Sequence, residues 1–85
     1  VEEEGKAEIE MGKLPSDKNY ALHFDAPKGT VIMVTNKANQ KTIFVKVNDT
    51  FKRNDSNPVI IKLSEKAAKQ IGLEDHGEVL LSYAR

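Results

Sequence analysis

Residues 27–49 read PKGTVIMVTNKANQKTIFVKVND, and this stretch decides the fold. It opens on Pro27-Lys28-Gly29, a combination of proline and glycine that predicts a turn. Residues 30–35 follow as a nearly continuous apolar run, too short and too rich in β-branched side chains for a helix. We therefore expect the turn to lead into a strand that is buried on both faces.

The second half of the stretch alternates between apolar and polar side chains. A polar connection at residues 36–40 precedes it, and the alternation covers residues 41–47. One face is expected to carry Ile43, Val45 and Val47, and the other Thr42, Phe44 and Lys46. Two strands joined by such a short connection predict a hairpin.

The rest of the chain adds further short strands. A first strand is predicted at residues 5–11, with Ala7, Ile9 and Met11 on one face. Extended segments are expected at residues 20–24, 59–61 and 78–83, separated by polar loops at 12–19 and 50–58.

One short helix is predicted after Ser64, whose hydroxyl can accept from a free backbone N–H of the first turn. Ala67, Ala68 and Ile71 form its apolar stripe, and Gly72 can end it in the left-handed conformation. The total of about six strands and one helix is too strand-rich for alternating strand–helix units. We expect an all-β fold with one short helix, closed into a small barrel that leaves few edges exposed.

The composition is that of one small globular domain. The 85 residues carry 13 basic and 13 acidic side chains, so no excess positive charge points to nucleic acid. Cysteine is absent, and no apolar run approaches the roughly 20 residues of a membrane span. The chain begins with Val1, and we interpret it as a piece of a longer protein that carries other domains. Residues 1–4 are expected to be a solvated linker remnant and residues 5–85 the domain.

Four short motifs follow one another in a specific order. They are Pro27-Lys28-Gly29-Thr30, Val34-Thr35-Asn36, Val45-Lys46-Val47-Asn48-Asp49, and Ile60-Ile61-Lys62-Leu63-Ser64 with the Ala67-Ala68 helix ending at Ile71-Gly72. In order and spacing they resemble the rare-lipoprotein-A-like (RlpA-like) family of cell-envelope proteins, which includes lytic transglycosylases acting on peptidoglycan. The resemblance runs from about Gly5 to Tyr83. It implies a six-stranded double-psi β-barrel and an extracytoplasmic location, in the periplasm or cell envelope.

The resemblance also implies a site. In catalytic members the Asp of Val-Asn-Asp is the general acid and an upstream His belongs to the same site; these positions are Asp49 and His23 here. A lytic transglycosylase needs one carboxyl group that protonates the leaving oxygen and then acts as a base, while the sugar's own 6-hydroxyl attacks the anomeric carbon. This route differs from that of hydrolases, which use two carboxylates.

The chain departs from the family pattern at several positions. Where the family continues Arg-Gly-Pro-Phe after the acid, this chain has Thr50-Phe51-Lys52-Arg53, and Lys62 replaces the Asp of Ile-Asp-Leu-Ser. The aromatic residues of the family's first strand are missing. We therefore interpret the chain as a divergent, catalytically degenerate relative that binds carbohydrate, with Phe51, Lys62 and Tyr20 as candidate ligand-binding residues.

Each candidate residue also has a structural interpretation. Asp49 can cap the turn after its strand, and His23 can be a hydrogen-bonding residue of the core. Phe51 can cover one barrel mouth, Tyr20 can pack at a barrel end, and Lys62 can belong to a solvated surface. We expect His76 in an exposed turn, and no metal or cofactor, because no ligand spacing is recognisable.

Three hypotheses follow for function. The first is an envelope domain that binds peptidoglycan glycan strands with little or no catalysis. The second is an active lytic transglycosylase that uses Asp49 as general acid and base. The third is a protein–protein interaction module that uses the barrel as a scaffold for an envelope partner. The three are separated by the products formed from glycan and by the partners bound, because a fold alone does not fix a function.

Overall fold

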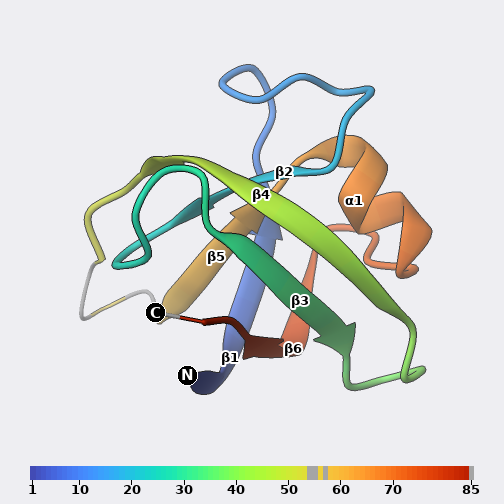
Figure 1. Cartoon of the computed structure of the whole chain (residues 1–85). Coiled ribbons are helices and arrows are strands. Elements are labelled where there is room, and N and C mark those ends of the chain that lie inside the picture. Colours follow the sequence, from blue (N-terminus) through green and yellow to red (C-terminus); the bar gives the residue numbers. More distant parts are fainter. Residues whose placement is uncertain (54–55, 57, 85) are drawn as a thin grey trace.

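The computed structural model describes residues 1–53, 56 and 58–84. Within these residues the chain forms six strands and one short helix (Figure 1). In chain order the elements are β1 (Glu2–Ile9), β2 (Tyr20–His23), β3 (Val31–Asn36), β4 (Thr42–Thr50), β5 (Val59–Leu63), α1 (Glu65–Gln70) and β6 (His76–Ser82). The loop predicted at residues 50–58 is present in part, and its residues 54, 55 and 57 lie outside the described residues.

The strands close into a barrel in the order β1-β5-β2-β4-β3-β6. The β1–β5 and β2–β4 pairs are parallel, and the other four pairs are antiparallel. Closure gives each of these strands a neighbour on both sides, although the two pairings cover different stretches: β1 pairs with β6 over residues 2–8 and with β5 over residues 6–9. The predicted all-β fold, a closed six-stranded barrel with one short helix, is confirmed. The double-psi connection stays a prediction with which the mixture of parallel and antiparallel pairs is consistent.

The hairpin predicted from residues 27–49 is formed by β3 and β4. Its register places Met33 opposite Phe44 and Val34 opposite Ile43. The turn is fixed by Asn36, whose carbonyl oxygen accepts a hydrogen bond from the Gln40 N–H at 2.7 Å. The strand β3 was expected to be buried on both faces, and this is wrong. Its side chains alternate between core and surface, because one face of a barrel strand always looks outward.

The core is filled by the inward side chains of all six strands together with α1. These residues are Ala7, Ala21, Ile32, Val34, Val45, Val47, Ile61, Leu63, Ala67, Ala68, Ile71, Val79 and Leu81. The predicted facing of residues 41–47 is confirmed, since Val45 and Val47 are buried while Phe44 and Lys46 are exposed. The small residues Ala7 and Ala21 lie among the branched ones, as expected where strands converge in a narrow barrel.

The first strand differs from its prediction at both ends. It begins at Glu2, so the acidic run expected to be a linker remnant is part of the barrel. Glu2, Glu3 and Glu4 pair with Ser82, Leu81 and Leu80 of β6. Backbone pairing holds these positions, and it does not require apolar side chains on the outer face. The strand ends at Ile9, so Met11, expected in the strand on the same face as Ala7, lies beyond it and is 69% exposed.

The helix begins and ends where the sequence predicts. The Ser64 hydroxyl caps it by accepting from the Ala67 N–H at 3.5 Å. Gly72 has a φ of 71°, and Leu73 donates its N–H to the Ala68 carbonyl at 2.8 Å, which closes a Schellman motif. No helix among the described residues is long and apolar enough to cross a membrane.

Candidate functional site

A hollow of about 460 Å³ opens beside Asp49, at the end of β4. It is lined by residues from four separate segments of the chain: Lys13, Leu22, Asn48, Asp49, Thr50, Phe51, Lys52 and Lys62. Its volume lies within the range of small-molecule sites, roughly 300–1,000 Å³. Three of the residues predicted for the site, Asp49, Phe51 and Lys62, therefore lie together.

The register of three neighbouring strands explains why these residues meet. Leu22 of β2 is paired with Asp49 of β4 on one side and with Lys62 of β5 on the other. Neighbouring strands lie about 4.8 Å apart, so the backbones at Asp49 and Lys62 are roughly 10 Å apart across Leu22. The carboxylate and the ammonium group thus flank an apolar floor.

Asp49 is exposed, and its Oδ1 accepts a hydrogen bond from the Thr50 N–H at 2.8 Å. The contact joins neighbouring residues at the end of β4, so it is not the cap of a turn after the strand that the sequence also allowed. Among the described residues that line the hollow, Asp49 is the only carboxylate. The described part of the lining therefore offers one acidic group.

Phe51 and Lys62 form one wall of the hollow. The Lys62 ammonium nitrogen lies 5.1 Å from the centroid of the Phe51 ring, which is within cation–π range. The contact holds the flexible lysine side chain against the half-buried ring. Phe51 and Lys62, both candidate ligand-binding residues in the sequence, therefore lie in the same wall of the hollow.

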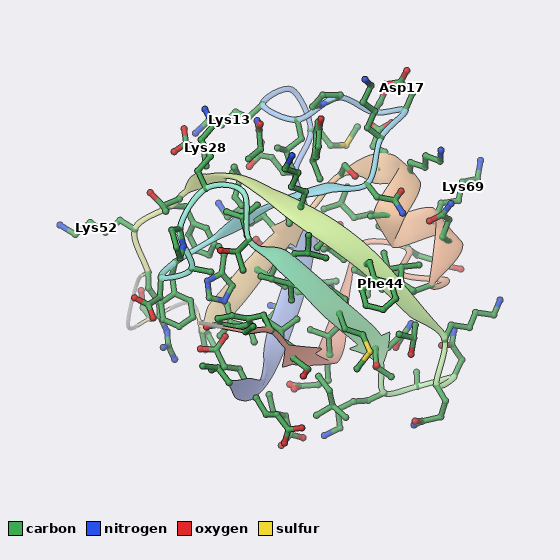
Figure 2. All side chains as sticks on the ribbon, in the orientation of Figure 1. Lys13, Asp17, Lys28, Phe44, Lys52 and Lys69 are labelled. Atoms are coloured by element: carbon green, nitrogen blue, oxygen red, sulfur yellow. The ribbon has the colours of Figure 1, made fainter. Side chains whose placement is uncertain are left out.

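Positive charge dominates the lining. In the part of the lining that the structure describes, Lys13, Lys52 and Lys62 carry three ammonium groups against the Asp49 carboxylate. In Figure 2 the Lys13 and Lys52 side chains project on one side of the molecule, and Lys69 of α1 projects on the other. Because opposite charges attract most strongly in a concave site, the hollow favours a ligand that carries a carboxylate or phosphate.

His23 has a different environment. Its ring is fully buried, and its Nδ1 accepts hydrogen bonds from the Asp25 N–H at 3.0 Å and the Ala26 N–H at 2.8 Å. We assign the ring proton to Nε2, because two backbone donors occupy Nδ1. From Nε2 the ring donates to the Glu3 carboxylate at 2.8 Å.

Aromatic contacts hold the His23 ring on two sides. The Phe24 ring stacks on it at a centroid distance of 4.6 Å, and the Tyr83 ring meets it edge-on at 5.3 Å. The Arg53 guanidinium lies 4.8 Å from the centroid of Phe24, so the stack reaches from the core to the surface loop. These contacts give His23 the hydrogen-bonding core role that the sequence also allowed.

The structure does not bring His23 and Asp49 into one site. Leu22, next to His23, is the residue paired with Asp49, and successive side chains of a strand point to opposite faces. His23 consequently points into the barrel, and the Asp49 side chain is exposed. Tyr20 is half-buried at the start of β2, opposite Lys46, and it does not line the hollow.

Sequence reasoning missed two contributors. Lys13 comes from the loop at residues 10–19, where no motif marks it. Glu3, the partner of His23, was placed in the linker remnant. His76 is exposed, as expected, but it begins β6 and does not lie in the predicted turn; its Nδ1 is 3.3 Å from the neighbouring Asp75 carboxylate. Among the described residues no group of three or more His, Cys, Asp or Glu side chains is arranged to hold a metal ion.

The functional interpretation depends on the chain's own residues. No protein-family model and no curated protein matches this sequence. Membership of the RlpA-like family therefore stays a prediction from the four motifs. The closed barrel and the hollow beside Asp49 are the structural observations on which a function can be proposed.

Proposed function

We propose that the hollow beside Asp49 binds glycan strands of peptidoglycan, and that this extracytoplasmic domain is a binding module with little or no catalysis. The observation that carries the proposal is the meeting of Asp49, Phe51 and Lys62 in one hollow of about 460 Å³. These residues were selected separately, on the motif resemblance and on their chemistry. The four-motif resemblance to RlpA-like barrels supports the choice of ligand.

The lining offers the groups that an amino-sugar chain requires. The Phe51 ring gives a flat apolar surface for the C–H groups of a pyranose ring. Asn48 and Thr50 offer polar side chains to hydroxyl and acetamido groups. Muramic acid carries a lactyl carboxylate, which is free in stem-peptide-free glycan, and the lysines provide its counter-charge.

Two observations support binding over cleavage. His23, the second residue of the expected catalytic pair, has both ring nitrogens engaged inside the barrel. Within residues 1–53, 56 and 58–84, Asp49 meets no second carboxylate in the lining, and the family's Asp of Ile-Asp-Leu-Ser is replaced by Lys62. The site thus retains charged and aromatic contacts without the groups that assist the acid.

Co-sedimentation with purified, stem-peptide-free glycan tests the proposal. Each of Lys52→Gln and Lys62→Gln removes one ionic contact of about 1 kcal/mol, which corresponds to a roughly fivefold loss of affinity. Lys69→Gln is the matched control, since Lys69 is exposed on α1 and projects on the other side of the molecule (Figure 2). Binding of the control should equal that of the wild type.

Two outcomes contradict the proposal. If the wild type does not pellet with glycan at moderate salt, glycan is not the ligand. If Lys52→Gln, Lys62→Gln and Lys69→Gln lose the same amount of binding, the hollow is not the binding site. Mass spectrometry of the soluble fraction is the second measurement. If the wild type forms anhydro-muramic products and Asp49→Asn does not, the domain is an active lytic transglycosylase and not a binding module.

A further inference from the structure

An exposed apolar surface lies on the strands β4, β3 and β6. Phe44 is 62% exposed, Val31 55% and Leu80 41%, and Met33 between them is half-buried. The register makes them neighbours: Met33 is paired with Phe44 on one side and with Ser82 on the other. We call the surface formed by Val31, Met33, Phe44 and Leu80 the apolar face.

The apolar face is separate from the hollow beside Asp49. The hollow lies over β5, β2 and the end of β4 at residues 48–50, and the apolar face lies over β6, β3 and the earlier part of β4 at Phe44. In Figure 2 the Phe44 side chain projects over the β3–β4 hairpin, well apart from Lys52 at the hollow. Clustered exposure of large apolar side chains is characteristic of an interaction surface.

A groove runs along the apolar face on the side of Met33 away from Phe44. Its volume is about 350 Å³. Apolar side chains from β3 and β6 and the three glutamates at the start of β1 line it, together with two hydroxyl residues: Glu2, Glu3, Glu4, Met33, Thr35, Leu80, Leu81 and Ser82. The face thus presents a protruding aromatic side chain and an open groove with an apolar floor and an acidic rim, and Met33 separates them.

We propose that this face is the interface of a symmetric dimer, formed with a second copy of the chain. A two-fold axis through Met33, parallel to β3, exchanges the two sides of the face. It places the Phe44 ring of each copy in the groove of the other, which is the self-complementarity that an isologous interface requires.

The charges at the two edges of the face fit the same arrangement. Lys46 lies two residues beyond Phe44 on the outer face of β4, and Glu2 lies at the far rim of the groove. Neither charged group makes an ion pair among the described residues, whereas Glu4 is already paired with Lys37. The two-fold rotation brings Lys46 of one copy toward Glu2 of the other, so each copy supplies the counter-charge that the other lacks.

Sedimentation equilibrium of the purified chain, from about 1 μM to about 1 mM, covers the range of weak association and tests the proposal. We expect a monomer–dimer equilibrium that Phe44→Glu weakens by about thirtyfold or more, as for a central aromatic of an interface. Met11→Glu is the matched control, because Met11 is equally exposed but lies in a loop away from the face. Far-UV circular dichroism and thermal melting verify that both variants are folded.

A charge exchange gives a second, independent measurement. Glu2→Lys and Lys46→Glu should each weaken the dimer, and the double variant should recover most of the loss, because the two groups meet across the interface. A chain that stays monomeric up to about 1 mM overturns the proposal, since its Kd would then exceed any specific association of this kind. The proposal is also overturned if Phe44→Glu leaves the dimer affinity unchanged, or if the double charge variant dimerises no better than the single variants.

Discussion

The burial of His23 predicts a large loss of stability in His23→Ala. The substitution removes a fully buried ring, together with the acceptor for the Asp25 and Ala26 N–H groups. A buried donor without a partner costs about 1–3 kcal/mol, and we take about 2 kcal/mol for the two donors together, because the first is only partly buried. The lost packing against Phe24 and Tyr83 adds about 2 kcal/mol, which gives about 4 kcal/mol in total.

A loss of this size is easily measured. A domain of this length has a free energy of unfolding of roughly 4–13 kcal/mol, from about 0.05–0.15 kcal/mol per residue. With a shift of about 4–8 °C per kcal/mol, Tm should fall by about 20 °C. The chain lacks tryptophan, so urea and thermal unfolding are followed by far-UV circular dichroism.

Glu3→Gln is the control for this experiment. Its amide oxygen can still accept from His23 Nε2, so we expect a loss below about 1 kcal/mol. If His23→Ala costs less than about 1 kcal/mol, the structural role assigned to His23 is refuted. His23→Ala also separates stability from function. At a temperature where this variant is folded, it should bind glycan as the wild type does, because His23 does not line the hollow.

Three further outcomes follow from the packing and the charges. Val45→Asp places an unpaired charge in the core and should abolish the cooperative thermal transition; a melt near the wild-type Tm would show that the facing of β4 is wrong. Gly72→Ala should destabilise the chain by about 1–2 kcal/mol in urea unfolding, because φ is 71° and the added Cβ would lie 2.9 Å from Asn39 Nδ2; an unchanged midpoint contradicts this cause. The hydrogen bond from Lys37 to Glu4 raises the pKa of Lys37 above its ordinary value, so the small stabilisation is complete below that value and disappears as the pH rises through the raised pKa. An NMR titration of the Lys37 ammonium should show the pKa falling in Glu4→Gln, and an unchanged titration would exclude the pair.

The fold was predictable where one periodicity dominates. Ile43, Val45 and Val47 alternate with outward residues, and the period of two fixes both the strand and its inner face. The end of the helix at Gly72 was equally clear, because a glycine after an apolar stripe has few other roles. These are local properties, and neighbouring residues are sufficient to determine them.

The sequence predictions failed where pairing with a distant strand determines the structure of a residue. Glu2 and Glu4 look like solvated linker, yet β6 pairs with them and makes them the outer face of a strand. Val31 looked like the start of a doubly buried strand, but only one face of a barrel strand meets the core. Sequence patterns near these residues contain no information about which strand becomes the neighbour.

The candidate site was predictable in part for the same reason. Motif and chemistry selected Asp49, Phe51 and Lys62, and the register of β4, β2 and β5 brings them together. His23 was paired with Asp49 on the motif alone. His23 lies one position beyond Leu22, the residue paired with Asp49, so its ring points to the opposite face of β2. Short motifs do not specify a register difference of one residue.

The pairing of β1 with both β5 and β6 has a consequence for how the chain folds. The strand β1 (residues 2–9) pairs with β5 (residues 59–63) and β6 (residues 76–82), so both of its edges stay uncovered until those strands have formed. Closing such large loops precedes the gain from the contacts, so folding should be slow for a domain of this size and limited by docking of the first strand. During synthesis, β1 leaves the ribosome before both of the strands that pair with it, and until they follow the edges of the unfinished barrel are open to pairing with other chains.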